Sequence, residues 1–265
     1  MSADLLSVSG LTKRFSRGGK AFAALDGVDF AIAPGETLAL VGPSGSGKST
    51  VARCILRLVE PDAGAIRFEG QDLLALSGAA LRSMRARLQM VFQDPLAAFN
   101  PRATVARLIN DPLRIHGLVP RAERPAAIAG LLERVGLSPD LATRHVHEIS
   151  GGQRQRVAIA RAIATKPRLI VLDEAVSALD VSVRAGVLRL LKALQDEDGL
   201  AYLFITHDLG VVRAVADRVA VMDAGRIVEQ GEPAQIIGAP TSATAKALVS
   251  AAPRLLGGET KQTRE

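Results

Sequence analysis

A glycine-rich stretch at 42–50 constrains the fold of this 265-residue chain more than any other feature. It fits the pattern G-x-x-x-x-G-K-[ST], follows the apolar segment Thr37–Val41 and precedes a helical pattern that starts near Lys48. Glycines let backbone N–H groups turn towards a polyanion, and a helix start adds partial positive charge. The order strand, loop, helix therefore predicts a nucleotide-phosphate cradle in an α/β fold. Its members are Gly42, Pro43, Ser44, Gly45, Ser46, Gly47, Lys48, Ser49 and Thr50.

Two carboxylates follow a second apolar segment, at 169–172. We expect Asp173 to hold Mg²⁺ together with the hydroxyl of Ser49, and Glu174 to act as base on an attacking water. Lys48 is expected to reach the terminal phosphates. Acidic pairs after strands often only cap the next helix. Next to a phosphate cradle, however, this pair predicts nucleotide hydrolysis.

Hydrophobic periodicity predicts a largely parallel sheet with an antiparallel N-terminal β edge. The last two strands are expected to form a hairpin through Ala224-Gly225. Six prolines between 94 and 161 indicate an inserted helical subdomain within one domain spanning 1–255, with a polar tail at 256–265. The expected strands are 5–8 and 21–32 at the edge, then 37–41, 169–172, 202–206, 219–222 and 226–229. The expected helices begin at Lys48, with Val51, Cys54, Ile55 and Leu58 on one face, and at Val181.

Composition excludes several kinds of protein. The single cysteine, Cys54, rules out an intramolecular disulfide and any metal site made of several thiolates. The longest apolar stretches are strand-sized, and no signal peptide is evident, so we expect a soluble, cytoplasmic chain. The net charge of +6 would suit nucleic acid, but the basic residues are dispersed, and aromatic residues make up only 3% of the chain.

A second glycine pair, in Ile-Ser-Gly-Gly-Gln-Arg-Gln-Arg at 149–156, resembles the signature of ATP-binding cassette (ABC) ATPases. Other positions of that family occur in order along nearly the whole chain. Gln93 matches the Q-loop, the Ser-Ala-Leu-Asp stretch ending at Asp180 matches the D-loop, and His207 matches the switch histidine. Phe15 matches the aromatic residue that stacks on adenine. The resemblance implies a P-loop NTPase core with the ABC ATPase fold.

The resemblance also implies how the protein works. Two ATPase domains pair head-to-tail, and each ATP lies between one cradle and the partner's signature. Closure and reopening of the pair rock membrane-spanning permease subunits bound near Gln93. A second ABC ATPase chain, forming a heterodimer or a homodimer, is therefore expected, with a separate solute-binding protein and a peripheral place on the cytoplasmic face of the membrane.

By this resemblance each motif has an expected role. Glu174, His207 and Gln93 are catalytic, and Ser49, Gln93 and Asp173 surround Mg²⁺. Ser150, Gly151, Gly152 and Gln153 contact the opposite nucleotide.

Segments 92–102 and 240–253 resemble the nickel, dipeptide and oligopeptide importer ATPases. Ala175, where peptide members commonly have proline, the short length and the N-terminal segment 6–12 resemble the second ATPase of nickel importers. A dipeptide or oligopeptide importer is the alternative. The four histidines show no ligand set, and His145 and His147 are interpreted as surface residues.

A nucleic-acid-linked ABC ATPase is disfavoured, because no heptads separate the cradle from the signature and the chain has one cassette. An exporter is disfavoured, because the cassette is not fused to membrane spans.

Overall fold

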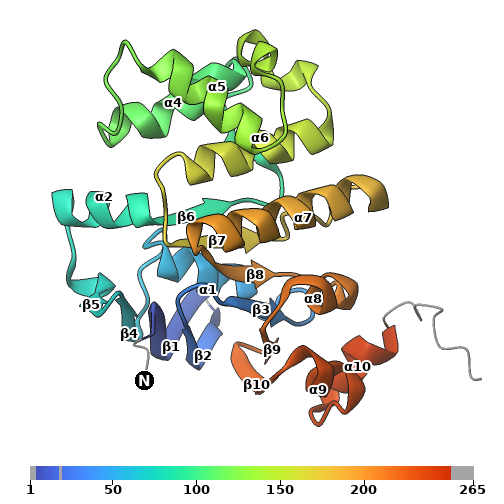
Figure 1. Cartoon of the computed structure of the whole chain (residues 1–265). Coiled ribbons are helices and arrows are strands. Elements are labelled where there is room, and N and C mark those ends of the chain that lie inside the picture. The colour runs from blue at the N-terminus through green and yellow to red at the C-terminus, as the bar shows by residue number, and fades with distance from the viewer. Residues whose placement is uncertain (1–3, 18–19, 252–265) are drawn as a thin grey trace, which may run out of the picture.

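The computed structural model describes residues 4–17 and 20–251, which fold into two sheets and a layer of helices (Figure 1). The larger sheet has the strand order β10-β9-β3-β8-β7-β6, and the smaller sheet has the order β2-β1-β4-β5. The strands of the larger sheet are β3 (Thr37–Val41), β6 (Leu88–Val91), β7 (Leu169–Asp173), β8 (Ala201–Ile205), β9 (Arg218–Asp223) and β10 (Arg226–Gly231). Those of the smaller sheet are β1 (Leu6–Arg17), β2 (Lys20–Ile32), β4 (Ala63–Phe68) and β5 (Gln71–Asp72).

The larger sheet is parallel from β9 through β3, β8 and β7 to β6, and only β10 pairs antiparallel, with β9. Strands β3 and β8 are buried along their whole length, as expected for parallel strands covered on both faces. Their carboxyl ends lie at one edge of the sheet, where ligands of open α/β sheets bind. The predicted P-loop core with a mainly parallel sheet is confirmed.

The helices that surround the sheets differ widely in length. Before β7 in the chain come α1 (Lys48–Ile55), α2 (Gly78–Arg87), α3 (Pro95–Ala98), α4 (Val105–Ile115), α5 (Arg124–Arg134) and α6 (Gly151–Ile163). Those following it are α7 (Val181–Asp198), α8 (Leu209–Val215), α9 (Pro233–Gly238) and α10 (Ala243–Ala251). No helix of the described residues is both long enough and apolar enough to cross a membrane.

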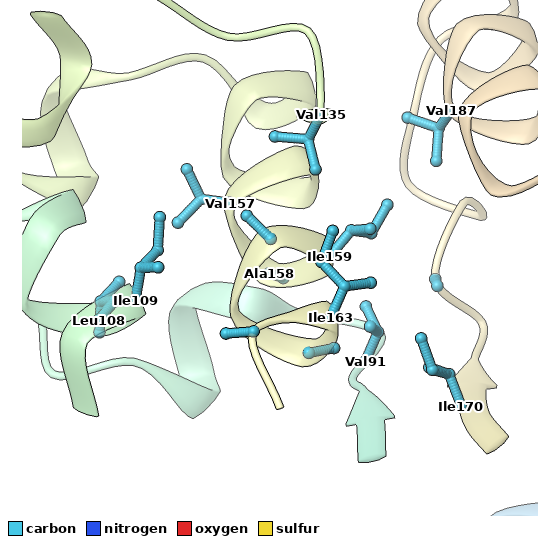
Figure 2. Close-up of a cluster of buried hydrophobic side chains, with 14 of the residues drawn as sticks. Val91, Leu108, Ile109, Val135, Val157, Ala158, Ile159, Ile163, Ile170 and Val187 are labelled. Carbon is cyan, nitrogen blue, oxygen red and sulfur yellow. The ribbon is translucent and has the colours of Figure 1, made fainter. Parts of the chain in front are cut away.

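Helix α6 joins the helical layer to the sheet. Figure 2 shows Val157 pointing towards Ile109 of α4, while Ile163 points towards Val91 of β6. These side chains are all at least 98% buried. Burial of each contributes about 1.5–3 kcal/mol of transfer free energy, so α6 is held from both sides. Helices α3–α6 fall largely within the predicted insertion at 94–161. That this insertion is a separate subdomain remains a prediction.

Two details of the sequence-based expectation are wrong. The strand expected at 5–8 is not an edge, because β1 runs from Leu6 to Arg17 and pairs with both β2 and β4. Leu58 does not share the buried face of α1: the helix ends at Ile55, Arg57 adopts a left-handed φ of 52°, and Leu58 is 55% exposed. The predicted hairpin through Ala224-Gly225 is confirmed. The polar tail at 256–265 lies outside the described residues.

Candidate nucleotide-hydrolysis site

The cradle depends on glycines where other backbones approach closely. A Cβ at Gly42 would overlap the carbonyl oxygen of Met222, and a Cβ at Gly47 would overlap that of Ala24. Gly47 also has a φ of 109°, a left-handed value that favours glycine. The hairpin turn supports the loop, since the Gly225 N–H donates to the Ser46 carbonyl at 3.0 Å. The sequence carried no signal that β2 and the β9–β10 hairpin hold the cradle.

Lys48 forms hydrogen bonds to other residues of the cradle. Its Nζ donates to the carbonyl oxygens of Gly42 (2.9 Å) and Pro43 (2.8 Å) and to Ser46 Oγ (3.3 Å). The residue is only 7% exposed, and burial lowers the pKa of the ammonium, while Glu174 and Asp173 act to raise it. A buried cation that contacts only neutral oxygens retains a strong electrostatic demand for an anion. Terminal phosphates would meet that demand.

Ser49 and Asp173 meet across the sheet edge. Ser49 Oγ donates to Asp173 Oδ1 at 3.2 Å, although the residues are 124 positions apart. Burial raises the pKa of Asp173, and the hydrogen bond from Ser49 opposes that rise. A hydroxyl and a carboxylate are the hard oxygen donors that Mg²⁺ prefers, with waters and substrate phosphates completing its shell. The donor set therefore fits Mg²⁺.

Glu174 lies between two side chains from other strand ends. Gln93 Nε2 donates to its Oε2 at 3.0 Å, and His207 Nδ1 lies 3.5 Å from its Oε1. Gln93 follows β6, Glu174 follows β7 and His207 follows β8, so the parallel register brings all three together. Glu174 also adopts a left-handed φ of 47°. Gln93 contacts Glu174 and makes no hydrogen bond to Ser49 or Asp173 among the described residues, so its expected place beside Mg²⁺ remains a prediction.

The signature residues form a helix cap. Ser150 Oγ accepts from the Gln153 N–H (3.2 Å), and Gln153 Oε1 accepts from the Ser150 N–H (2.9 Å), a reciprocal capping box at the start of α6. Gly151 is exposed, whereas a Cβ on Gly152 would press on the Val183 side chain of α7 at 2.5 Å. Within residues 4–17 and 20–251, no hydrogen bond or ion pair joins this cap to the cradle.

Phe15 and Asp180 are the other two residues that the sequence predicted for the site. Phe15 pairs with Phe22 across β1 and β2, with ring centroids 6.0 Å apart, and Lys13 Nζ lies 5.6 Å from the Phe15 centroid. Phe22 is two residues from Ala24, whose carbonyl oxygen lies close to Gly47. Asp180 caps α7, and hydrogen bonds from the Val183 N–H and Ser182 hydroxyl lower its pKa.

His145 and His147 stack with ring centroids 5.4 Å apart just before the signature. Among the described residues, no cluster of three or more histidines, cysteines or carboxylates could hold a metal ion.

The fold and the arrangement of the site are those of a P-loop nucleotide-binding protein. A family model described as "ABC transporter" matches residues 25–177, more than half of the chain. The chain belongs to the ABC transporter family.

The protein is similar to curated members of this family. The glutathione import ATP-binding protein GsiA of Escherichia coli (strain K12) is 50% identical over 245 residues, which are 92% of this chain and 39% of the relative. GsiA of Shigella flexneri has the same identity and coverage. The chain therefore spans about two fifths of the length of these relatives.

Solved structures agree with this assignment. The dimeric post-hydrolysis structure of the ATP-binding cassette MJ0796 bound to ADP and Pi has a TM-score of 0.79 at 31% identity, covering 86% of this chain and 98% of that one. The structure of cbiO1 from Clostridium perfringens, part of the ABC transporter complex cbiONQ, has a TM-score of 0.78 at 30% identity, covering 89% and 91%.

Proposed function

We propose that this chain is the ATP-binding subunit of an importer for short peptides, with glutathione or a similar small peptide as the solute. The observation that carries the proposal is the 50% identity, over 92% of the chain, to glutathione import proteins. The sequence favoured nickel and kept peptides as the alternative, and the comparisons support that alternative better. Ala175 and the N-terminal segment 6–12 are the sequence features that favour nickel.

The proposed reaction is attack of water on the γ-phosphorus of ATP, which breaks the bond to the β–γ bridging oxygen and releases ADP and phosphate. Glu174 accepts the proton of that water, and Gln93 and His207 fix the direction of its two carboxylate oxygens. Lys48 exchanges its contacts with the loop carbonyls for the terminal phosphates, and the cradle N–H groups bind their oxygens. Ser49 and Asp173 would hold Mg²⁺, which neutralises phosphate charge when bound.

The proposed assembly pairs this chain with a second ABC ATPase. The exposed glycine and the capping box at the start of α6, which make no hydrogen bond or ion pair to the chain's own cradle among the described residues, support the expectation that Ser150–Gly151–Gly152–Gln153 serves the nucleotide of a partner chain. The MJ0796 cassette, whose solved form is described as dimeric, gives the same support. Heterodimeric and homodimeric forms are both compatible with this arrangement.

Membrane-spanning permease subunits are proposed to dock beside Gln93. A groove of about 300 Å³ lies next to Phe92, the residue before Gln93, and is lined by residues of β6 and α6 that include Met90, Ala162 and Arg161. Arg161 lies 5.8 Å from the Phe99 ring at this groove, and burial lowers the pKa of its guanidinium. Docking there would place the chain peripherally on the cytoplasmic face of the membrane, where a solute-binding protein supplies the permease from the other side.

The test is parallel uptake of labelled glutathione, a labelled dipeptide and labelled nickel in source cells carrying Lys48→Ala. Lys192→Ala, a change of an exposed lysine on α7, is the matched control. Loss of peptide uptake with nickel uptake intact supports the proposal, and loss of nickel uptake alone returns the chain to the nickel branch. If no uptake changes while the purified chain binds DNA with a steep salt dependence, the importer proposal is overturned.

A further inference from the structure

Arg184 on α7 joins two loops of the site that no motif of the sequence connects. Its guanidinium donates through one terminal nitrogen to Asp208 Oδ2 at 2.6 Å and through the other to the Leu179 carbonyl at 3.1 Å. Its side chain is only 26% exposed. Asp208 directly follows His207, and Leu179 directly precedes Asp180, so one side chain holds both loops.

The Asp208 end of this bridge is rigid. Asp208 Oδ1 accepts from the Gly210 and Val211 N–H groups and caps α8, while the Asp208 N–H donates to Thr206 Oγ1 at 3.0 Å. Because Oδ1 is committed to the cap, Oδ2 is left for Arg184. The direction in which His207 leaves β8 is therefore fixed by the residue that follows it.

The Leu179 end of this bridge is connected to Glu174 through Ser177. Both the N–H and the hydroxyl of Ser177 donate to the Glu174 carbonyl, at 3.1 and 2.9 Å. His207 in turn lies 3.5 Å from the Glu174 carboxylate. The contacts close a ring that runs from Glu174 through 177–179, Arg184, Asp208 and His207 back to Glu174.

We propose that Arg184 is a positioning residue for hydrolysis, which sets His207 against Glu174 and transmits movement of the 177–180 loop to both. The inference rests on the proposed roles of Glu174 and His207. Arginine suits the task because its planar fork reaches two acceptors at once, whereas a lysine offers a single point charge. The alternative is a purely structural tie between α7 and α8.

The experiment compares ATPase activity of the purified full chain with Arg184→Met, Arg184→Lys, Asp208→Asn and the double variant Arg184→Met/Asp208→Asn. Asparagine at 208 keeps the helix cap and removes the charge that Arg184 meets. Exposed Arg189 on the same helix gives the control Arg189→Met. We expect Arg184→Met to lower kcat about tenfold, equivalent to about 1.4 kcal/mol, with KM for ATP within about twofold. The double variant should lose no more kcat than the worse single variant, because both changes break the same Arg184–Asp208 contact.

A readout independent of turnover is the ring signal of His207 in histidine-labelled NMR spectra. The chain has four histidines, and His207→Gln identifies the signal. Arg184→Met should shift this signal and leave that of His116 unchanged, whereas Arg189→Met should shift neither.

An unchanged kcat together with an unshifted His207 signal would overturn the inference, and so would additive losses in the double variant. Full activity of Glu174→Gln would instead refute the proposed base, so the two failures are distinguishable.

Discussion

The amide in place of the base, Glu174→Gln, tests the chemistry of the site most directly. Glutamine keeps the size of the side chain and can still accept one of the two contacts, from Gln93 or His207, which lie 3.0 and 3.5 Å away. It cannot take a proton from water. A positioned base contributes about 10²–10⁴ in rate, so we expect kcat to fall about a thousandfold, equivalent to about 4 kcal/mol of transition-state stabilisation.

ATP binding should survive this change, because the cradle and Lys48 contact the phosphates independently of the carboxylate. The assays are single-turnover hydrolysis, equilibrium ATP binding and gel filtration with ATP, where the variant should favour the closed dimer. Glu197→Gln, on the exposed end of α7, is the control and should hydrolyse normally. Hydrolysis by Glu174→Gln within about threefold of the natural rate would refute the assignment of Glu174 as the base.

Three further predictions concern the buried groups of the site. Lys48→Ala should abolish tight ATP binding in a calorimetric titration, and unchanged affinity would exclude the cradle as the site. Cys54 is fully buried and its pKa is raised by burial to about 11, so thiol labelling at pH 8 should be slow in the folded chain and fast in denaturant. Burial also raises the pKa of Asp173, so its ionised form destabilises the nucleotide-free fold. Asp173→Asn should therefore melt at a higher temperature than the natural chain at pH 7, and the difference should vanish as the pH falls towards 3.8, while hydrolysis is lost.

The sequence predicted the strands, helix starts and turns that depend only on neighbouring residues. The segment Thr37–Val41, the helix start at Lys48 and the hairpin turn at Ala224-Gly225 all follow from short-range periodicity and turn chemistry. The full extent of β1 could not be predicted, because its second half depends on pairing with β2, whose register joins Leu11 to Val28 and Phe15 to Phe22. Such pairing is a property of the folded sheet and leaves no mark on the strand itself.

The same division holds for the site. The motifs identified Lys48, Asp173 and Glu174, but not the contact of Gln93 with Glu174, which spans 81 positions. Arg184 carried no signal at all in the sequence, because an arginine on an amphipathic helix is usually a solvated side chain. Its partners become visible only when the ends of β7 and β8 lie next to each other.

The left-handed backbone conformation of Glu174 favours a different residue for stability than for the proposed activity. A left-handed φ of 47° costs a non-glycine residue about 1 kcal/mol, and glycine would occupy the same turn with less strain. A library selected only for heat resistance would therefore enrich Glu174→Gly and discard the carboxylate that is proposed to act as the base. Any attempt to raise the melting temperature of this chain therefore needs an activity screen at position 174. Glycine there would favour stability, whereas the proposed catalysis requires glutamate.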